Sequence, residues 1–163
     1  MTLPRERRRP SAFEQPFRCL VVRRNAGCGS SGDRAVIVNE TRYNITVGVS
    51  TTYVAEQSQP ERNRYVFAYT ITLRNMGRTG AQLLSRHWVI TDASGRVQEV
   101  RGEGVVGERP RLEPGESYRY TSGAVLETPV GTMEGSYRMI ADDGIGFEAP
   151  IPRFRLSVPN ALH

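Results

Sequence analysis

The sequence contains no lysine, and all 22 of its basic residues are arginines. Against 17 acidic residues they give a formal net charge of +5, which is unevenly distributed. Residues 1–41 hold eight arginines and four acids, whereas residues 42–163 hold 14 arginines and 13 acids. Because the larger part is close to neutral, a basic body built to hold nucleic acid is excluded, and nucleic acid is an unfavoured partner.

Long apolar runs are also missing. No stretch approaches the about 20 residues of a membrane span or the about 7–15 residues of a secretory signal core. The length of 163 residues excludes a (β/α)₈ barrel, which needs about 250 residues, and a two-domain dinucleotide enzyme. We expect a soluble, cytoplasmic protein without membrane insertion, made of one domain and a tail.

Cysteine and histidine are scarce. The two cysteines, Cys19 and Cys28, have no neighbouring ligands to complete a zinc site, and a disulfide between them requires an oxidising compartment. The two histidines are His87 and His163, and neither completes a Ser–His–Asp or Cys–His set. His87 is interpreted as a half-exposed strand residue. We therefore predict no catalytic residue, no metal, no cofactor and no enzymatic activity, and we disfavour a hydrolase of phosphorylated metabolites.

Residues 1–41 combine arginine, proline, glycine and serine without a sustained apolar period. Such a segment buries too little apolar surface to offset its chain entropy, so we predict a disordered tail. A nucleic-acid-binding arm is the less favoured alternative. The folded domain is predicted to cover residues 42–163.

From Tyr43 onward the apolar residues recur with period two, which is typical of strands with one buried face. Turn signals at Asp92–Gly95, Pro114–Gly115 and Asp143–Gly144 separate the strands, and Pro150 and Pro152 favour a sheet edge for the last one. The pattern predicts an all-β, immunoglobulin or fibronectin type III-like sandwich of about seven antiparallel strands. The predicted inward sets and strands are Ile45, Val47, Val49 and Tyr53; Tyr65, Phe67, Tyr69, Ile71 and Leu73; Leu84, Trp88 and Ile90, which share their face with Arg86; and 97–101, 117–126, 135–141 and 147–158.

Gly102-Glu-Gly104-Val-Val-Gly107 has the G-x-G-x-x-G spacing of dinucleotide-binding loops. That motif must open a helix, and Pro114–Gly115 would end any helix here within a few residues, so a dinucleotide site is disfavoured. Two interpretations stay open. One is a glycine-rich turn, and the other is an anion-binding loop in which backbone N–H groups and Arg101, Arg109 and Arg111 hold a phosphate-type anion.

Two weaker patterns have structural explanations. Asp142 and Asp143 precede a glycine and are interpreted as turn formers rather than ligands of a hard cation. Arginines alternate with aromatic residues at 118–120, 137–138 and 153–155. Strand alternation, which buries the aromatic ring and exposes the arginine, is favoured over stacking with single-stranded nucleic acid.

Several longer motifs closely resemble the bacterial ApaG family. The resemblance extends from about Ile45 to His163, whereas residues 1–41 depart from the family. The motifs are RYVFAYTITLRN at 64–75, GEGVVG at 102–107, YTSGA at 120–124, ETPVGTM at 127–133 and PRFRLSVP at 152–159.

The resemblance implies a fibronectin type III-like sandwich and an association with cobalt resistance and magnesium efflux. It carries over no catalytic residue. Since a chain without a membrane span cannot move an ion across a bilayer, we expect an indirect role through an unknown protein partner. The predicted function is a non-enzymatic interaction module, with weak phosphate or pyrophosphate binding by the 102–107 loop as the alternative.

Overall fold

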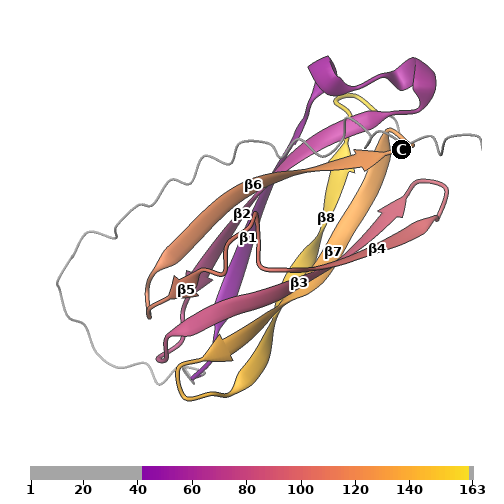
Figure 1. The fold of residues 1–163 in the computed structure, drawn as a ribbon. Helices are drawn as coiled ribbons and strands as arrows, with labels where there is room; N and C mark the ends of the chain where they lie inside the picture. Colours follow the sequence, from indigo (N-terminus) through magenta and orange to yellow (C-terminus); the bar gives the residue numbers. More distant parts are fainter. Residues whose placement is uncertain (1–41, 162–163) are drawn as a thin grey trace, which may run out of the picture.

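The computed structural model describes residues 42–161, so the predicted tail at residues 1–41, with both cysteines, lies outside the described residues. The described chain forms two antiparallel sheets packed face to face (Figure 1). This confirms the predicted all-β sandwich. The elements are β1 (Ile45–Tyr53), η1 (Ala55–Gln57), η2 (Pro60–Arg62), β2 (Tyr65–Asn75), β3 (Ala81–Asp92), β4 (Val97–Glu103), β5 (Arg111–Leu112), β6 (Ser117–Leu126), β7 (Val130–Ala141) and β8 (Gly146–Ser157).

One sheet has the strand order β1-β2-β6, and the other has the order β4-β3-β7-β8, with the short β5 pairing to β3. At one side of the sandwich β1 packs against β8. At the other side each sheet ends in an edge strand, β4 in one and β6 in the other. No helix within residues 42–161 has the length and apolar character needed to cross a membrane.

The period-two patterns place their apolar residues between the sheets. In β2, Phe67, Tyr69, Ile71 and Leu73 are buried, while the threonines between them are only half-buried. The predicted edge position of the last strand is also confirmed, because β8 is the outer strand of the five-stranded sheet. Edge strands tolerate proline, because the backbone positions on their outer side have no strand to pair with.

Two strand predictions need correction. The strand predicted to begin at Gly135 begins at Val130, since Thr132 already pairs with Thr91 of β3 and Arg155 of β8. In β3, Leu83 is fully buried in place of the predicted Leu84, which is half-buried. The reason is a register shift between Leu83 and Ser85, where an extra residue changes which side chains face inward.

The predicted turns are present and carry the expected backbone. Gly95, Gly115 and Gly144 have φ of +83°, +83° and +85°, the left-handed region that glycine adopts without strain. Asp92 also supports its turn, because its carboxylate accepts hydrogen bonds from the backbone N–H groups of Ser94 and Arg96 at 2.9 and 3.0 Å. The turns at Gly95 and Gly144 join strands that pair antiparallel, β3 with β4 and β7 with β8, whereas the turn at Gly115 leads from β5 to β6 in the other sheet.

Candidate functional site

The predicted glycine loop follows β4 and closes as a tight hairpin. Gly104 donates its N–H to the carbonyl of Leu84 at 2.8 Å. Val105 and Glu108 exchange both backbone hydrogen bonds, at 2.8 and 2.9 Å, across a two-residue turn. The turn residues Val106 and Gly107 both have positive φ, +50° and +77°, as a type I′ hairpin requires.

This geometry explains why the loop contains glycine. No helix follows it within the described residues, where the chain enters β5, so the dinucleotide arrangement is absent there. An anion nest needs convergent free N–H groups, and those of Gly104, Val105 and Glu108 already donate to carbonyls. The contacts therefore favour the interpretation as a turn, and anion binding by this loop stays a prediction.

Gly102 lies against Arg86, which shares the predicted inward face of the strand but was assigned no role from the sequence. The two residues pair across β3 and β4, and a Cβ on Gly102 would lie 2.9 Å from the Arg86 guanidinium carbon. Arg86 Nη1 donates to the carbonyls of Glu103 at 3.0 Å and Gly104 at 2.7 Å. Arg86 thus holds the base of the loop. In the sequence, its inward position was indicated by the strand face that it shares with Trp88.

The three arginines predicted to charge the loop are each paired with acids and do not meet at one site. Arg101 lies 3.5 Å from Glu99, and Arg109 pairs with Glu103. Arg111, on β5, pairs with Glu113 and with Asp142, whose Oδ1 lies 2.9 Å from the arginine Nε. The hydrogen bond from Arg111 holds the pKa of the Asp142 carboxyl below its usual range.

The second acid of the predicted turn, Asp143, accepts hydrogen bonds from the Tyr43 hydroxyl and, at 3.1 Å, from the backbone N–H of Ile145. These bonds, the tyrosine bond first, lower the pKa of the Asp143 carboxyl. Both acids therefore have structural partners. Across residues 42–161 no three histidine, cysteine or carboxylate side chains are grouped as a metal site would need.

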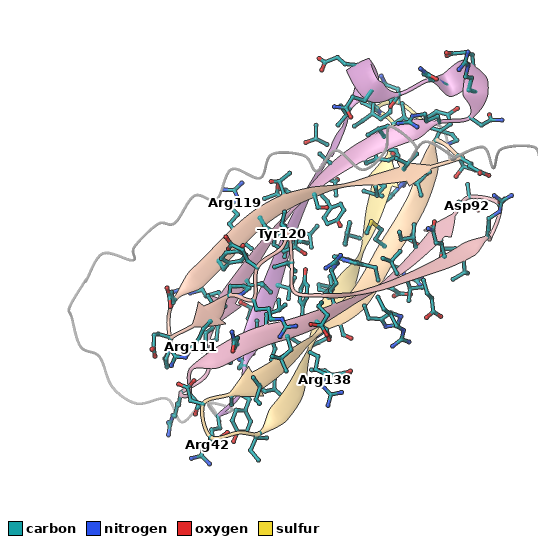
Figure 2. The ribbon with its side chains drawn as sticks, in the orientation of Figure 1. Arg42, Asp92, Arg111, Arg119, Tyr120 and Arg138 are labelled. Atoms are coloured by element: carbon teal, nitrogen blue, oxygen red, sulfur yellow. The ribbon has the colours of Figure 1, made fainter. Side chains whose placement is uncertain are left out.

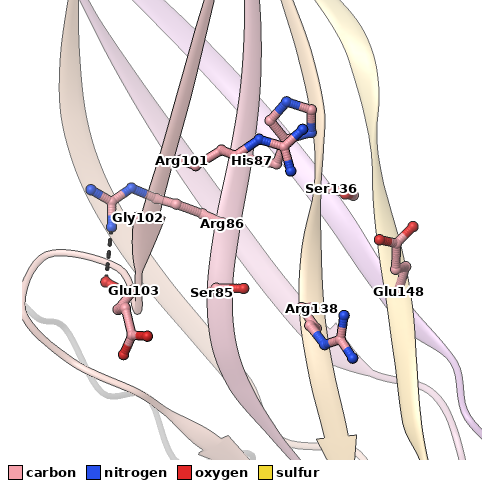
Figure 3. Close-up of a pocket in the computed structure, with 9 residues that line it drawn as sticks. All are labelled: Ser85, Arg86, His87, Arg101, Gly102, Glu103, Ser136, Arg138 and Glu148. Carbon is pink, nitrogen blue, oxygen red and sulfur yellow. Dashed lines mark hydrogen bonds between the residues drawn. The ribbon is translucent and has the colours of Figure 1, made fainter.

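The outer face of the five-stranded sheet carries a hollow of about 400 Å³, which we call the sheet-face hollow (Figure 3). His87 lies in it with its side chain 28% exposed, as expected for a half-exposed strand residue, and its Nε2 is 3.0 Å from Glu99. This hydrogen bond lowers the pKa of the Glu99 carboxyl. The lining residues are Ser85, Arg86, His87, Arg101, Gly102, Glu103, Ser136, Arg138 and Glu148.

A second depression, of about 340 Å³, lies between the edge strands β4 and β6, and we call it the inter-sheet groove. Gln98 and Val100 of β4 line one wall, and Ser122 and Ala124 of β6 line the other. Its floor includes Trp88 and Met133, both almost completely buried. Arg86 and Tyr69 add polar groups at the same place.

Three tyrosines are buried in the core, and one of them, Tyr69, lines this groove. The hydroxyls of Tyr120 and Tyr137 are hydrogen-bonded to each other. Tyr120 lies between the sheets, whereas Arg138, the residue that follows Tyr137 in the chain, projects outward (Figure 2). Burial raises the pKa of Tyr69, Tyr120 and Tyr137. These phenols stay protonated at neutral pH and serve as neutral hydrogen-bonding groups of the core.

The interpretation as a turn predicts unequal effects of one substitution at two glycines of the loop. Gly104 and Gly107 both have positive φ, so alanine at either costs about 1–2 kcal/mol from the backbone alone. A Cβ at Gly107 meets nothing within 4 Å, whereas at Gly104 it would overlap the carbonyl oxygen of Glu108. We expect Gly104→Ala to lower the free energy of unfolding more than Gly107→Ala, as measured by urea denaturation. Equal losses would contradict this description of the loop.

Comparison of the chain with known proteins finds matches to one family. The ApaG domain model matches residues 55–141 of this chain. Protein ApaG of Thiobacillus denitrificans is 62% identical over 122 residues, which cover 75% of this chain and 96% of the relative. Protein ApaG of Azotobacter vinelandii is 61% identical over 126 residues, which cover 77% of this chain and 100% of the relative.

A solved structure agrees in fold and sequence. The crystal structure of the putative ApaA protein from Bordetella pertussis superimposes on this chain with a TM-score of 0.72 at 53% sequence identity. The match covers 74% of this chain and 98% of that protein.

Proposed function

The chain belongs to the ApaG family, and from this membership we propose that it works as a non-enzymatic module that binds a partner protein. The observation that carries the proposal is the open side of the sandwich, where two edge strands face solvent beside the inter-sheet groove. An edge strand presents unpaired backbone N–H and C=O groups, which can pair with an extended segment of another protein.

The groove adds selectivity to this edge. Val100 and Ala124 present apolar surface from opposite walls, and Arg86 and Gln98 present donors. A partner segment lying along β4 or β6 would place alternate side chains into the groove, because successive side chains of a strand point to opposite faces. The inter-sheet groove and its two edge strands form the proposed binding surface.

The association with cobalt and magnesium that the resemblance implies would then act through the partner. In this proposal the chain binds a transporter of divalent cations or a regulator of one, and the module itself carries no ion. The effect on cobalt resistance and magnesium efflux would then depend on which protein the module binds.

Affinity capture from a bacterial lysate tests this surface with two variants on the same strand. Gln98→Arg adds a long charged side chain inside the inter-sheet groove, and Val97→Arg adds the same residue on the other face of β4, where Val97 is 57% exposed. We expect wild type and Val97→Arg to retain the same protein and Gln98→Arg to lose it. Melting curves of the three proteins check that both variants are folded.

The opposite result has a defined meaning. If Gln98→Arg retains everything that wild type retains, or if no protein is retained by any of them, the groove is not a partner site and the proposal is wrong.

A further inference from the structure

The sheet-face hollow lies on the opposite side of the five-stranded sheet from the inter-sheet groove, and its side chains come from adjacent strands held in register. His87 of β3 pairs with Arg101 of β4 on one side and with Ser136 of β7 on the other. One step along the same face, Ser85 of β3 pairs with Arg138 of β7. Strand pairing therefore brings two arginines, two serine hydroxyls and one imidazole to a single depression (Figure 3).

Two of the arginines are available to a ligand. Among residues 42–161 no carboxylate lies within ion-pair distance of Arg138, although Glu148 is its register partner on β8. Arg101 lies 3.5 Å from Glu99, with side-chain exposures of 73% and 55%. An exposed ion pair of this kind contributes little, about 0–1 kcal/mol, so the guanidinium can turn to a competing anion.

The other charged side chains of the hollow lie around Arg101 and Arg138. Arg86 also lines the hollow, but its guanidinium extends to the backbone of Glu103 and donates to its carbonyl (Figure 3). The Glu103 carboxylate pairs with Arg109, which neutralises it. Glu148 is the remaining acid of the lining, and Glu99 lies next to the hollow against His87 and Arg101; both weaken rather than support anion binding.

We propose that the sheet-face hollow binds a phosphate group, held by the guanidinium groups of Arg101 and Arg138 and by the hydroxyls of Ser85 and Ser136. Guanidinium and hydroxyl donors match the tetrahedral oxygens of phosphate, and hydrogen bonds between opposite charges are the stronger kind. The site is distinct from the predicted loop site, because it uses Arg101 but none of Gly104, Gly107, Arg109 and Arg111. It is also independent of the proposed partner surface.

Pyrophosphate titration of the full-length protein, followed by amide and arginine side-chain NMR, tests the site. We expect saturable shifts at Ser85, Arg101, Ser136 and Arg138, with smaller shifts in the glycine loop. Arg138→Gln should weaken binding at least about tenfold, the loss expected for a hydrogen bond to a charged group. Glu148→Gln should tighten binding about two- to fivefold, because it removes the opposing charge at the rim.

The matched control is Arg153→Gln. Arg153 is an arginine of the neighbouring strand whose guanidinium is already bound to Glu134, with Nη2 2.9 Å from Oε1. It should leave the affinity within about twofold, since an exposed ion pair outside the site contributes little.

Three results would overturn the proposal. The first is the absence of saturable shifts. The second is an equal loss of affinity in Arg138→Gln and Arg153→Gln, which would indicate diffuse attraction. The third is a set of shifts centred on Gly104 and Gly107 that Arg109→Gln abolishes, which would place the anion in the loop.

Discussion

Gly135→Ala is expected to prevent cooperative folding. A Cβ at this position would lie 3.0 Å from the carbonyl carbon of His87, closer still to its oxygen, and 3.2 Å from the Trp88 Cα. These are backbone atoms of β3, the strand beside β7, and both strands are interior to the five-stranded sheet. Neither strand can move away without breaking its other pairing, so the overlap cannot be relieved by rotating a side chain.

We expect this substitution to cost about 4–5 kcal/mol or more, the range reached only by severe core defects. That is comparable to the whole stability of a marginal domain, so little soluble protein should form and thermal unfolding should lose its cooperative transition. Circular dichroism during heating and the soluble yield measure both effects.

Gly48→Ala is the matched control, because it makes the same change in a strand where the nearest atom to the new Cβ is 3.8 Å away. It should change the free energy of unfolding by no more than about 1 kcal/mol. A Gly135→Ala protein that melts like wild type would show that β3 and β7 are not as close as described.

Trp88→Ala is expected to lower the free energy of unfolding by about 3–5 kcal/mol, the usual loss for a large buried aromatic side chain. Trp88 is 2% exposed and makes edge contacts with Tyr69, Tyr137 and Phe154, at centroid distances of 5.4, 6.2 and 5.9 Å. The three partners come from both sheets, so the indole joins the two layers of the sandwich. Urea denaturation measures the loss.

Trp88→Phe separates the packing of the ring from its polar atom. Within residues 42–161 the indole Nε1 is buried and donates to no acceptor, a cost that phenylalanine removes. We therefore expect a clearly smaller loss than for Trp88→Ala. Because Trp88 is the only tryptophan, its emission in the native protein should be blue-shifted, and emission near that of free tryptophan in water would contradict its burial.

Much of the fold could be predicted because a strand with one buried face shows alternating apolar residues within a single segment of the sequence. The alternation from Phe67 to Leu73 needs only one chain segment to be recognised. The turn at Gly95 and the edge position of Pro150 follow from backbone chemistry that each residue carries with it. Leu84 was misplaced because an extra residue in β3 is visible only when the pairing with β7 is known.

The candidate sites were harder to predict, because their residues are distant in sequence. Glycine spacing drew attention to Gly102, Gly104 and Gly107, yet Gly102 lies against the Arg86 guanidinium and Gly104 belongs to a closed hairpin. Arg109 pairs with Glu103 of the loop itself and Arg111 pairs with the distant Asp142, so both guanidinium groups are bound to carboxylates. No spacing rule identified Arg138 as a neighbour of Ser85.

The sequence alone determined that this chain is an all-β member of the ApaG family with a near-neutral body, because composition, periodicity and motifs are properties of single segments. Only the tertiary structure decided which side chains share a surface. Register between strands places Arg101, His87 and Ser136 in one row, and the edges of the two sheets leave β4 and β6 on opposite walls of the inter-sheet groove. Both depend on pairing between segments far apart in the chain, and a shift of one residue would turn each of these side chains to the opposite face.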